Sequence, residues 1–158
     1  MNSAFRLREA TIDDSASISS LLEELGHHLS PQLVAGQLRR IASLNNGYFV
    51  IVGTTGDRVV GLASGFPTPV LHREFPVGRL SLLVVANSHI GQGLGSMLLR
   101  EAEKRLLQQG CIHIELTTAS HRKEAHEFYR HKGYREQGLR FSRELITEES
   151  KDTAQHQL

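Results

Sequence analysis

The sequence predicts an α/β fold in which a mixed central sheet is flanked by about four helices. In residues 80–117, a nearly continuous apolar run is followed by a glycine-rich turn, an amphipathic helix and an alternating segment. That order is a strand–helix–strand crossover, which joins parallel strands. Residues 48–53 and 58–66 are rich in β-formers and are separated by the turn-forming residues 54–57, which indicates an antiparallel hairpin. Parallel and antiparallel pairs together predict a mixed sheet.

One strand and two helices are expected before the hairpin. Residues 5–10 alternate apolar and polar side chains, and Asp13 or Asp14 can cap a helix that ends at Gly26. Its expected apolar face consists of Ile18, Leu21, Leu22 and Leu25. A second helix begins at Ser30-Pro31 and stops at residues 45–47, Asn-Asn-Gly.

The crossover itself has three predicted parts. Residues 80–86 suit a central strand that is buried on both faces. The helix from about Leu94 ends at Gly110, and residues 112–117 alternate as a strand. The expected buried face of this helix consists of Leu98, Ala102 and Leu106.

The remainder of the chain predicts one more helix and two short strands. The helix covers residues 122–132, is ended by Gly133, and has Ala125, Phe128 and Tyr129 on one face. The strands are expected around Tyr134 and over residues 140–145. We therefore expect a single domain over residues 1–146. Residues 147–158 are polar without a periodic apolar face, which predicts a disordered tail.

Composition restricts the classes of partner. A chain of 158 residues with a net charge of +1 suits one domain and gives no overall field for nucleic acid or an anionic membrane. No apolar run reaches membrane-spanning length, and polar residues near the N-terminus do not match a signal peptide. The sequence predicts a cytoplasmic protein that binds neither nucleic acid nor a membrane.

Cysteine and histidine give no chemistry of their own. Cys111 is the only cysteine and opens an apolar segment, which favours a buried structural thiol over a nucleophile. The nine histidines lack a dense pattern of metal ligands, so we assign no metal site.

The glycine-rich turn predicts a phosphate cradle. Gly91, Gly93 and Gly95 lack the Cβ atoms that would keep a ligand from the backbone, and the following helix offers its N-terminal dipole to an anion. A P-loop would need a lysine before Ser or Thr, and a dinucleotide fingerprint would need glycine at position 96 or 98. Ser96 and Leu98 occupy these positions. A phosphate-bearing ligand other than NAD or FAD is expected.

Two motifs in order resemble the GCN5-related N-acetyltransferase (GNAT) superfamily. The first is Gly-x-Gly-x-Gly from Gly91, followed by Met-Leu-Leu, after a strand that ends in Leu-Val-Val. The second is residues 120–134, in which an alanine precedes a Phe-Tyr pair and a Gly-aromatic pair ends the helix. The similarity runs over most of residues 5–145 and implies a sheet that is splayed where acyl-CoA inserts. Within the superfamily, the chain is also similar to aminoalkylphosphonate N-acetyltransferases.

The resemblance implies a binding site for acetyl-CoA that uses mostly main-chain atoms. The end of the central strand would pair with the pantetheine amides, and the turn would hold the pyrophosphate. The implied cofactor-binding residues are Leu83, Val84, Val85, Ile90, Gly91, Gln92, Gly93, Leu94, Gly95 and Ser96. Ile90 departs from the family pattern, since Arg or Gln usually precedes the first glycine.

The resemblance implies Tyr129 as the catalytic acid that protonates the departing thiolate. Many relatives carry a glutamate base at the position of Ser81, and a serine hydroxyl cannot take that role at neutral pH. Water, Glu115 or His89 can take the proton instead, or the amine can arrive already neutral. Glu115 is also explained as a solvated strand carboxylate. The lost acid further argues against the divalent ion that acceptor sites of the aminoalkylphosphonate enzymes can involve.

The function that we expect is N-acetylation of the primary amine of a small molecule, by direct transfer from acetyl-CoA in a ternary complex. Glu23 and Glu24 could attract a cationic amine, although such residues are usually the wet face of a helix. A non-catalytic acyl-CoA-binding or regulatory module and a protein lysine or N-terminal acetyltransferase remain alternatives. An exposed sheet edge makes a homodimer possible.

Overall fold

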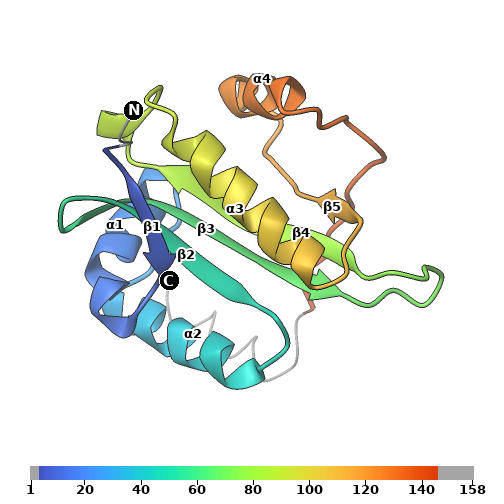
Figure 1. Cartoon of the computed structure of the whole chain (residues 1–158), viewed down its shortest axis with the longest axis horizontal. Helices are drawn as coiled ribbons and strands as arrows, with labels where there is room; N and C mark the ends of the chain where they lie inside the picture. Colours follow the sequence, from blue (N-terminus) through green and yellow to red (C-terminus); the bar gives the residue numbers. More distant parts are fainter. Residues whose placement is uncertain (1–3, 146–158) are drawn as a thin grey trace. The chain divides into compact units, whose positions relative to one another are not determined.

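The computed structural model describes residues 4–145 of the chain and contains a five-stranded mixed sheet (Figure 1). Strand order follows chain order, and β1 to β4 pair antiparallel while β4 and β5 pair parallel. The strands are β1 Arg6–Glu9, β2 Phe49–Thr55, β3 Arg58–Thr68, β4 Val77–Val85 and β5 His113–Glu115. The predicted fold class, a mixed sheet with four α-helices, is confirmed.

The helices lie where the sequence placed them. They are α1 Ser15–Glu24, α2 Pro31–Leu44, α3 Leu94–Gln108 and α4 Lys123–His131, with 3-10 turns η1 Ile12–Asp14 and η2 Asn87–His89. The Ser30 side chain accepts a hydrogen bond from the Leu33 N–H, and Asn45 ends α2 in the left-handed conformation with φ 45°. Both predicted signals of helix α2 are therefore confirmed.

Two compact units can be separated in the chain, Met1–Thr117 and Thr118–Leu158, and each is described by itself. The first holds the sheet and helices α1 to α3, and the second holds α4. The single domain expected over residues 1–146 stays a prediction. The tail predicted over residues 147–158 lies outside the described residues.

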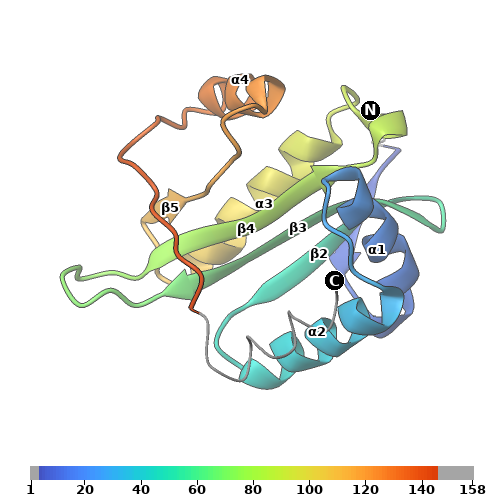
Figure 2. The same cartoon turned by 180° about the vertical axis from the view of Figure 1, so that it is seen from behind.

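In the first unit, the sheet separates two layers of helix (Figure 2). Helices α1 and α2 pack on one face, whose buried cluster is Ile18, Leu21, Leu22, Val34, Val52, Leu62 and Val84. Helix α3 packs on the other face. There Gly61 lets α3 lie close, because a Cβ at this position would come within 2.7 Å of Leu94 Cδ2.

Several predicted strands differ from the structure. The hairpin turn has only Gly56 and Asp57, because β2 continues to Thr55. The predicted strand over residues 112–117 is shortened to β5, and Ile112 before it is 70% exposed. Strand β4 is not buried on both faces, since Ser81 is exposed and its neighbours Leu82 and Leu83 are half-buried.

The two strands predicted after α4 are wrong for the described residues. Residues 134–145 form no strand, and the large apolar side chains of this segment, Leu139, Phe141 and Leu145, are almost fully exposed. An alternating pattern favours an extended backbone, but a strand also requires a partner for its hydrogen bonds.

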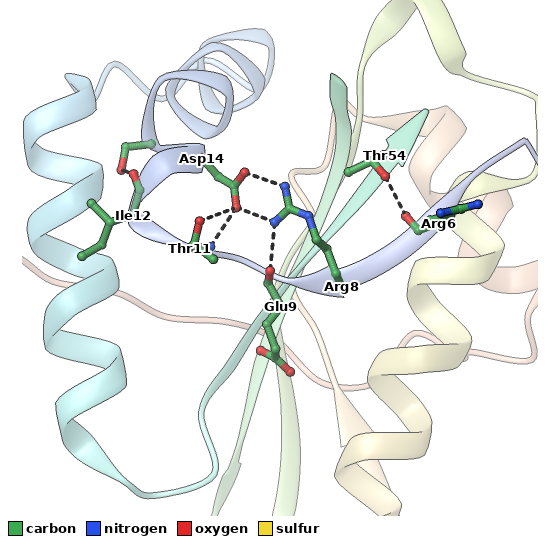
Figure 3. Close-up of polar contacts among 8 residues, drawn as sticks. Arg6, Arg8, Glu9, Thr11, Ile12, Asp14 and Thr54 are labelled. Atoms are coloured by element: carbon green, nitrogen blue, oxygen red, sulfur yellow. Dashed lines mark hydrogen bonds and ion pairs between the residues drawn. The ribbon is translucent and has the colours of Figure 1, made fainter. Parts of the chain in front are cut away.

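Asp14 holds the start of α1 to β1 (Figure 3). Its two carboxylate oxygens accept hydrogen bonds from Arg8 Nη1 and Nη2, both at 2.8 Å, and Oδ2 also accepts from the Thr11 backbone N–H at 2.7 Å. Asp14 thus occupies the expected cap position of α1, but its side chain makes no cap hydrogen bond to that helix. The hydrogen bonds from Arg8 lower the pKa of Asp14 below its usual value, while burial opposes the shift.

We expect Asp14→Asn to lower the free energy of unfolding by about 1–2 kcal/mol at neutral pH, since a charge-assisted pair with a half-exposed arginine is lost. In wild type the unfolded state binds more protons than the folded state as the pH falls below about 4, so the contribution of Asp14 declines there and is lost once the pH passes below its lowered pKa. Urea unfolding at pH 7 and at about pH 3 measures both effects. The matched variant at the exposed neighbour, Asp13→Asn, should leave the free energy of unfolding almost unchanged. Equal stability of Asp14→Asn and wild type at neutral pH would contradict the expected role.

Candidate active site

Strand β4 has an edge that is only partly paired. It pairs with β3 along its whole length, but with β5 only at Val77, Gly78 and Arg79. From residue 80 to 85, its second edge has no strand partner within the described part of the chain. The predicted residues 83–85 lie in this stretch. Their backbone groups are placed to pair with an extended ligand, as a strand would.

The chain passes from β4 through η2 into the N-terminus of α3. Gly91 and Gly93 have φ of +80° and +91°, and Gly93 is the N-cap of α3 without a side-chain cap hydrogen bond. The Met97 N–H donates to the Gly93 carbonyl at 3.1 Å, so the N–H groups of residues 94–96 precede the first helical bond. These donors and the helix dipole are suited to an anion, as the sequence predicts.

The turn leaves room for a ligand. A Cβ built on Gly91 or Gly93 would meet no atom of the protein within 4 Å, so neither glycine is explained by packing inside the chain. Ile90 is 60% exposed, and the exposed Gln92 uses its Nε2 to donate to the Ser88 carbonyl at 3.5 Å. The residues predicted for the cradle therefore lie together at one helix end, while their binding of a cofactor stays a prediction.

Ser81 lies in a β-bulge on β4. Ser64 of β3 pairs with Leu82 and Gly65 pairs with Leu80, so Ser81 is the extra residue. Its Oγ lies 2.6 Å from the Oγ of the buried Ser64 and 3.3 Å from the hydroxyl oxygen of Tyr48. A cluster of three neutral hydroxyls, which we call the hydroxyl cluster, thus stands where many relatives are expected to carry a carboxylate. Sequence reasoning missed Ser64 and Tyr48.

The other candidate bases already have partners. The Glu115 side chain is 49% exposed, and its Oε1 lies 3.7 Å from His113 Nε2. His89 Nδ1 lies 2.7 Å from Ser88 Oγ, and its ring packs edge-on against Phe5. The exposure of Glu115 supports its interpretation as a solvated carboxylate.

The glutamates at the end of α1 also have partners within the protein. Glu24 Oε2 accepts a hydrogen bond from the Asn87 backbone N–H at 2.9 Å, and Glu23 Oε1 lies 2.7 Å from His28 Nδ1. Glu24 therefore connects α1 to the turn after β4.

Tyr129 lies on α4 in the second unit, in a cluster of aromatic rings. Its ring centroid is 5.3 Å from that of Phe128 and 5.6 Å from that of Tyr134, both in edge-on geometry. Burial raises the pKa of Tyr129 to about 12, although the positive charge of Arg122 acts against the shift. The phenol is therefore protonated across the physiological range, as a proton donor must be.

Structural roles account for the other groups considered from the sequence. His126 Nε2 lies 2.9 Å from the Ala119 carbonyl oxygen, so this side chain connects α4 to the segment before it, and no side chain caps the start of α4. Cys111 is buried at 4% exposure, and its desolvation raises the pKa of the thiol.

Within residues 4–145, no three His, Cys, Asp or Glu side chains gather in a way that could hold a metal ion. None of the described helices is long and apolar enough to cross a membrane.

Residues 16–134 match the family model for the acetyltransferase (GNAT) family. The chain therefore belongs to this family and is an acyltransferase. It is 34% identical over 143 residues to the aminoalkylphosphonate N-acetyltransferase of Salmonella typhimurium strain LT2. The matched region covers 88% of this chain and 90% of that protein.

Solved structures show the same fold. A transcriptional regulator from Bacillus halodurans C-125 is 26% identical with a TM-score of 0.77, and the match covers 87% of this chain and 99% of that one. A Trypanosoma brucei acetyltransferase is 25% identical with a TM-score of 0.75, with 89% and 99% covered. The resemblance seen in the two sequence motifs is thus confirmed at the level of the family and the fold.

Proposed function

We propose that this acyltransferase moves an acetyl group from acetyl-CoA to the primary amine of a small molecule, by direct transfer in a ternary complex. The observation that carries the proposal is the unpaired edge of β4, which leads directly into the uncapped N-terminus of α3. This arrangement offers backbone donors and acceptors to an amide-bearing chain and then N–H donors to a pyrophosphate. Membership of the acetyltransferase family supports the same donor.

Each end of the arrangement has a role in the proposal. Residues 83–85 pair with the pantetheine amides, and residues 90–96 hold the pyrophosphate through main-chain N–H groups. Because Ile90 offers no polar side chain, affinity depends on the backbone at this point more than in relatives with Arg or Gln.

The chemistry proposed is a single acyl transfer. The amine nitrogen attacks the thioester carbonyl carbon, a C–N bond forms, and the C–S bond breaks. The departing thiolate takes a proton from Tyr129, which recovers one from solvent, and the proton of the amine leaves to water. With its pKa raised to about 12, the Tyr129 phenol is protonated at neutral pH, as the donor role requires, but the same shift makes it a weaker acid.

An aminoalkylphosphonate is the first acceptor to test, because the similar Salmonella enzyme is named for that substrate class. Ser81 and Ile90 favour one alternative, a non-catalytic acyl-CoA-binding module, since both depart from the family pattern. A protein acetyltransferase is the other alternative. The cytoplasmic location and a possible homodimer stay predictions.

A thermal-shift titration with acetyl-CoA, followed by a thiol-release assay against a panel of amines, tests the proposal. The panel contains aminoalkylphosphonates, polyamines, amino acids and a lysine-containing peptide. Stabilisation that grows with ligand concentration, together with turnover of a small amine, is expected. Stabilisation without any turnover would favour the binding module, and turnover of the peptide alone would favour a protein acetyltransferase. No stabilisation would contradict the acetyl-CoA site.

A further inference from the structure

The turn between β4 and α3 is held in part by a side chain from α1. Its first residues form η2, and Ala86 at the N-cap position has no side-chain oxygen to offer the N–H groups that open this element. The carboxylate of Glu24 takes that place, since its Oε2 accepts a hydrogen bond from the Asn87 N–H at 2.9 Å. A residue 63 positions earlier in the chain therefore caps the start of the turn.

Glu24 lies at an unfavourable place for α1 itself. It is the last residue of this helix, whose C-terminal end carries partial negative charge, and no basic residue lies in the last turn. The ion pairs found among residues 4–145 do not include Glu24, whereas the neighbouring Glu23 lies beside His28. The contact with Asn87 is thus the interaction that the structure gives this carboxylate.

The turn needs such an anchor because most of it faces solvent. Residues 87–93 are largely exposed, and Gly91 and Gly93 give the backbone more freedom than other residues would. The His89 ring adds a second anchor, since it packs edge-on against the buried Phe5. A ligand that binds a loose turn must order it first and loses affinity by that cost. Contacts that order the turn in advance therefore favour binding.

We propose that Glu24 is a positioning residue for acetyl-CoA, because it holds the Asn87 N–H and thereby keeps the turn in the conformation that receives the pyrophosphate. The inference rests on the proposed function and adds to it a residue from outside both sequence motifs. It assigns Glu24 to the side of the acyl donor, and not to the amine that its negative charge could attract. Because such coupling is reciprocal, bound acetyl-CoA should slow hydrogen exchange at the Asn87 amide.

Calorimetric titration with acetyl-CoA, in the absence of an amine, tests this role directly. Glu24→Ala should weaken the affinity about tenfold, the value of a lost hydrogen bond to a charged group near the surface. Glu24→Gln keeps a side-chain oxygen that can accept from Asn87 and should recover most of the affinity. Glu23→Ala, the matched variant at the preceding residue, should bind acetyl-CoA as wild type does.

Hydrogen exchange and kinetics separate positioning from a general loss of structure. In the free protein, Glu24→Ala should lose protection at the Asn87 amide, while the amides of Leu21 and Leu22 within α1 keep theirs. In steady-state kinetics, the KM of Glu24→Ala for acetyl-CoA should rise about tenfold, and its KM for the amine acceptor found in the panel should not rise.

Asn87→Pro removes the same hydrogen bond from the donor side. Proline lacks the N–H and is tolerated at the first position of a helix. Ala86 before it already has a ψ of 137°, within the extended range that a following proline favours. With the donor absent, Glu24→Ala should cause no further loss, so the double variant should bind acetyl-CoA like Asn87→Pro alone.

Three outcomes would overturn the inference and leave the acetyl-CoA site intact: unchanged affinity in Glu24→Ala, no recovery in Glu24→Gln, or a further tenfold loss in the double variant. A raised KM for the amine alone would also overturn it, because Glu24 would then act on the acceptor. If wild type itself binds no acetyl-CoA, the proposed function fails, and this inference with it.

Discussion

Replacing Gly93 with valine should abolish measurable binding of acetyl-CoA, with a loss of affinity of about a hundredfold or more. The Cβ and its methyl groups would occupy open space at the N-terminus of α3, where we propose that the pyrophosphate binds. The φ of +91° also becomes strained for a side chain. Isothermal calorimetry with acetyl-CoA measures the loss directly.

Gly110 provides the matched control for this variant. It also has a positive φ, +87°, and its Cβ would likewise meet no atom within 4 Å, but it lies at the opposite end of α3. Gly110→Val therefore carries similar backbone strain without touching the cradle. We expect the free energy of unfolding to fall by a similar amount in both variants, and the affinity for acetyl-CoA to fall only in Gly93→Val. Unchanged calorimetric affinity in Gly93→Val would remove the cradle from the proposed function.

Tyr129→Phe should lower kcat by about a hundredfold or more, the usual contribution of a positioned general acid, and leave the affinity for acetyl-CoA unchanged. The phenyl ring keeps the packing against Phe128 and Tyr134 and removes only the hydroxyl. Steady-state kinetics measure the fall in kcat, and calorimetry with acetyl-CoA checks that the affinity is unchanged.

Tyr134→Phe is the control within the same aromatic cluster, and it should retain most of the activity. A fully active Tyr129→Phe would exclude Tyr129 from the mechanism. A large fall in both variants, together with lowered thermal stability, would instead indicate that the cluster is needed only for the fold of this part of the chain.

The crossover could be predicted because its signals are local. Helix α3 begins after Gly93 at its N-cap and ends before Gly110, so the residues that define both ends lie next to the helix in the sequence. The same is true of Ser30, Pro31 and Asn45 around α2. Caps and glycines act over one turn of backbone, so sequence alone is enough to detect them.

The hydroxyl cluster could not be predicted because it depends on pairing between distant strands. Ser64 and Ser81 are 17 residues apart in the chain, and Tyr48 is 33 residues from Ser81. Their contact also requires the bulge, since a shift of one residue in register exchanges the faces of a strand. The predicted β4 was wrong in its burial for the same reason: the apolar pattern gave no indication that one residue would be pushed out of the ladder.

Because Cys111 is buried, the protein itself should contribute little background to an assay that detects the thiol of released CoA. Since this residue is the only cysteine and its thiol is both shielded and hard to ionise, a disulfide dye that reports free CoA should be consumed very slowly by the folded chain. The absorbance of the reacted dye then measures the amount of CoA released, with little background from the protein. The same dye also measures structural integrity, because any condition or variant that opens the contact between α3 and the segment after it will expose one thiol per chain.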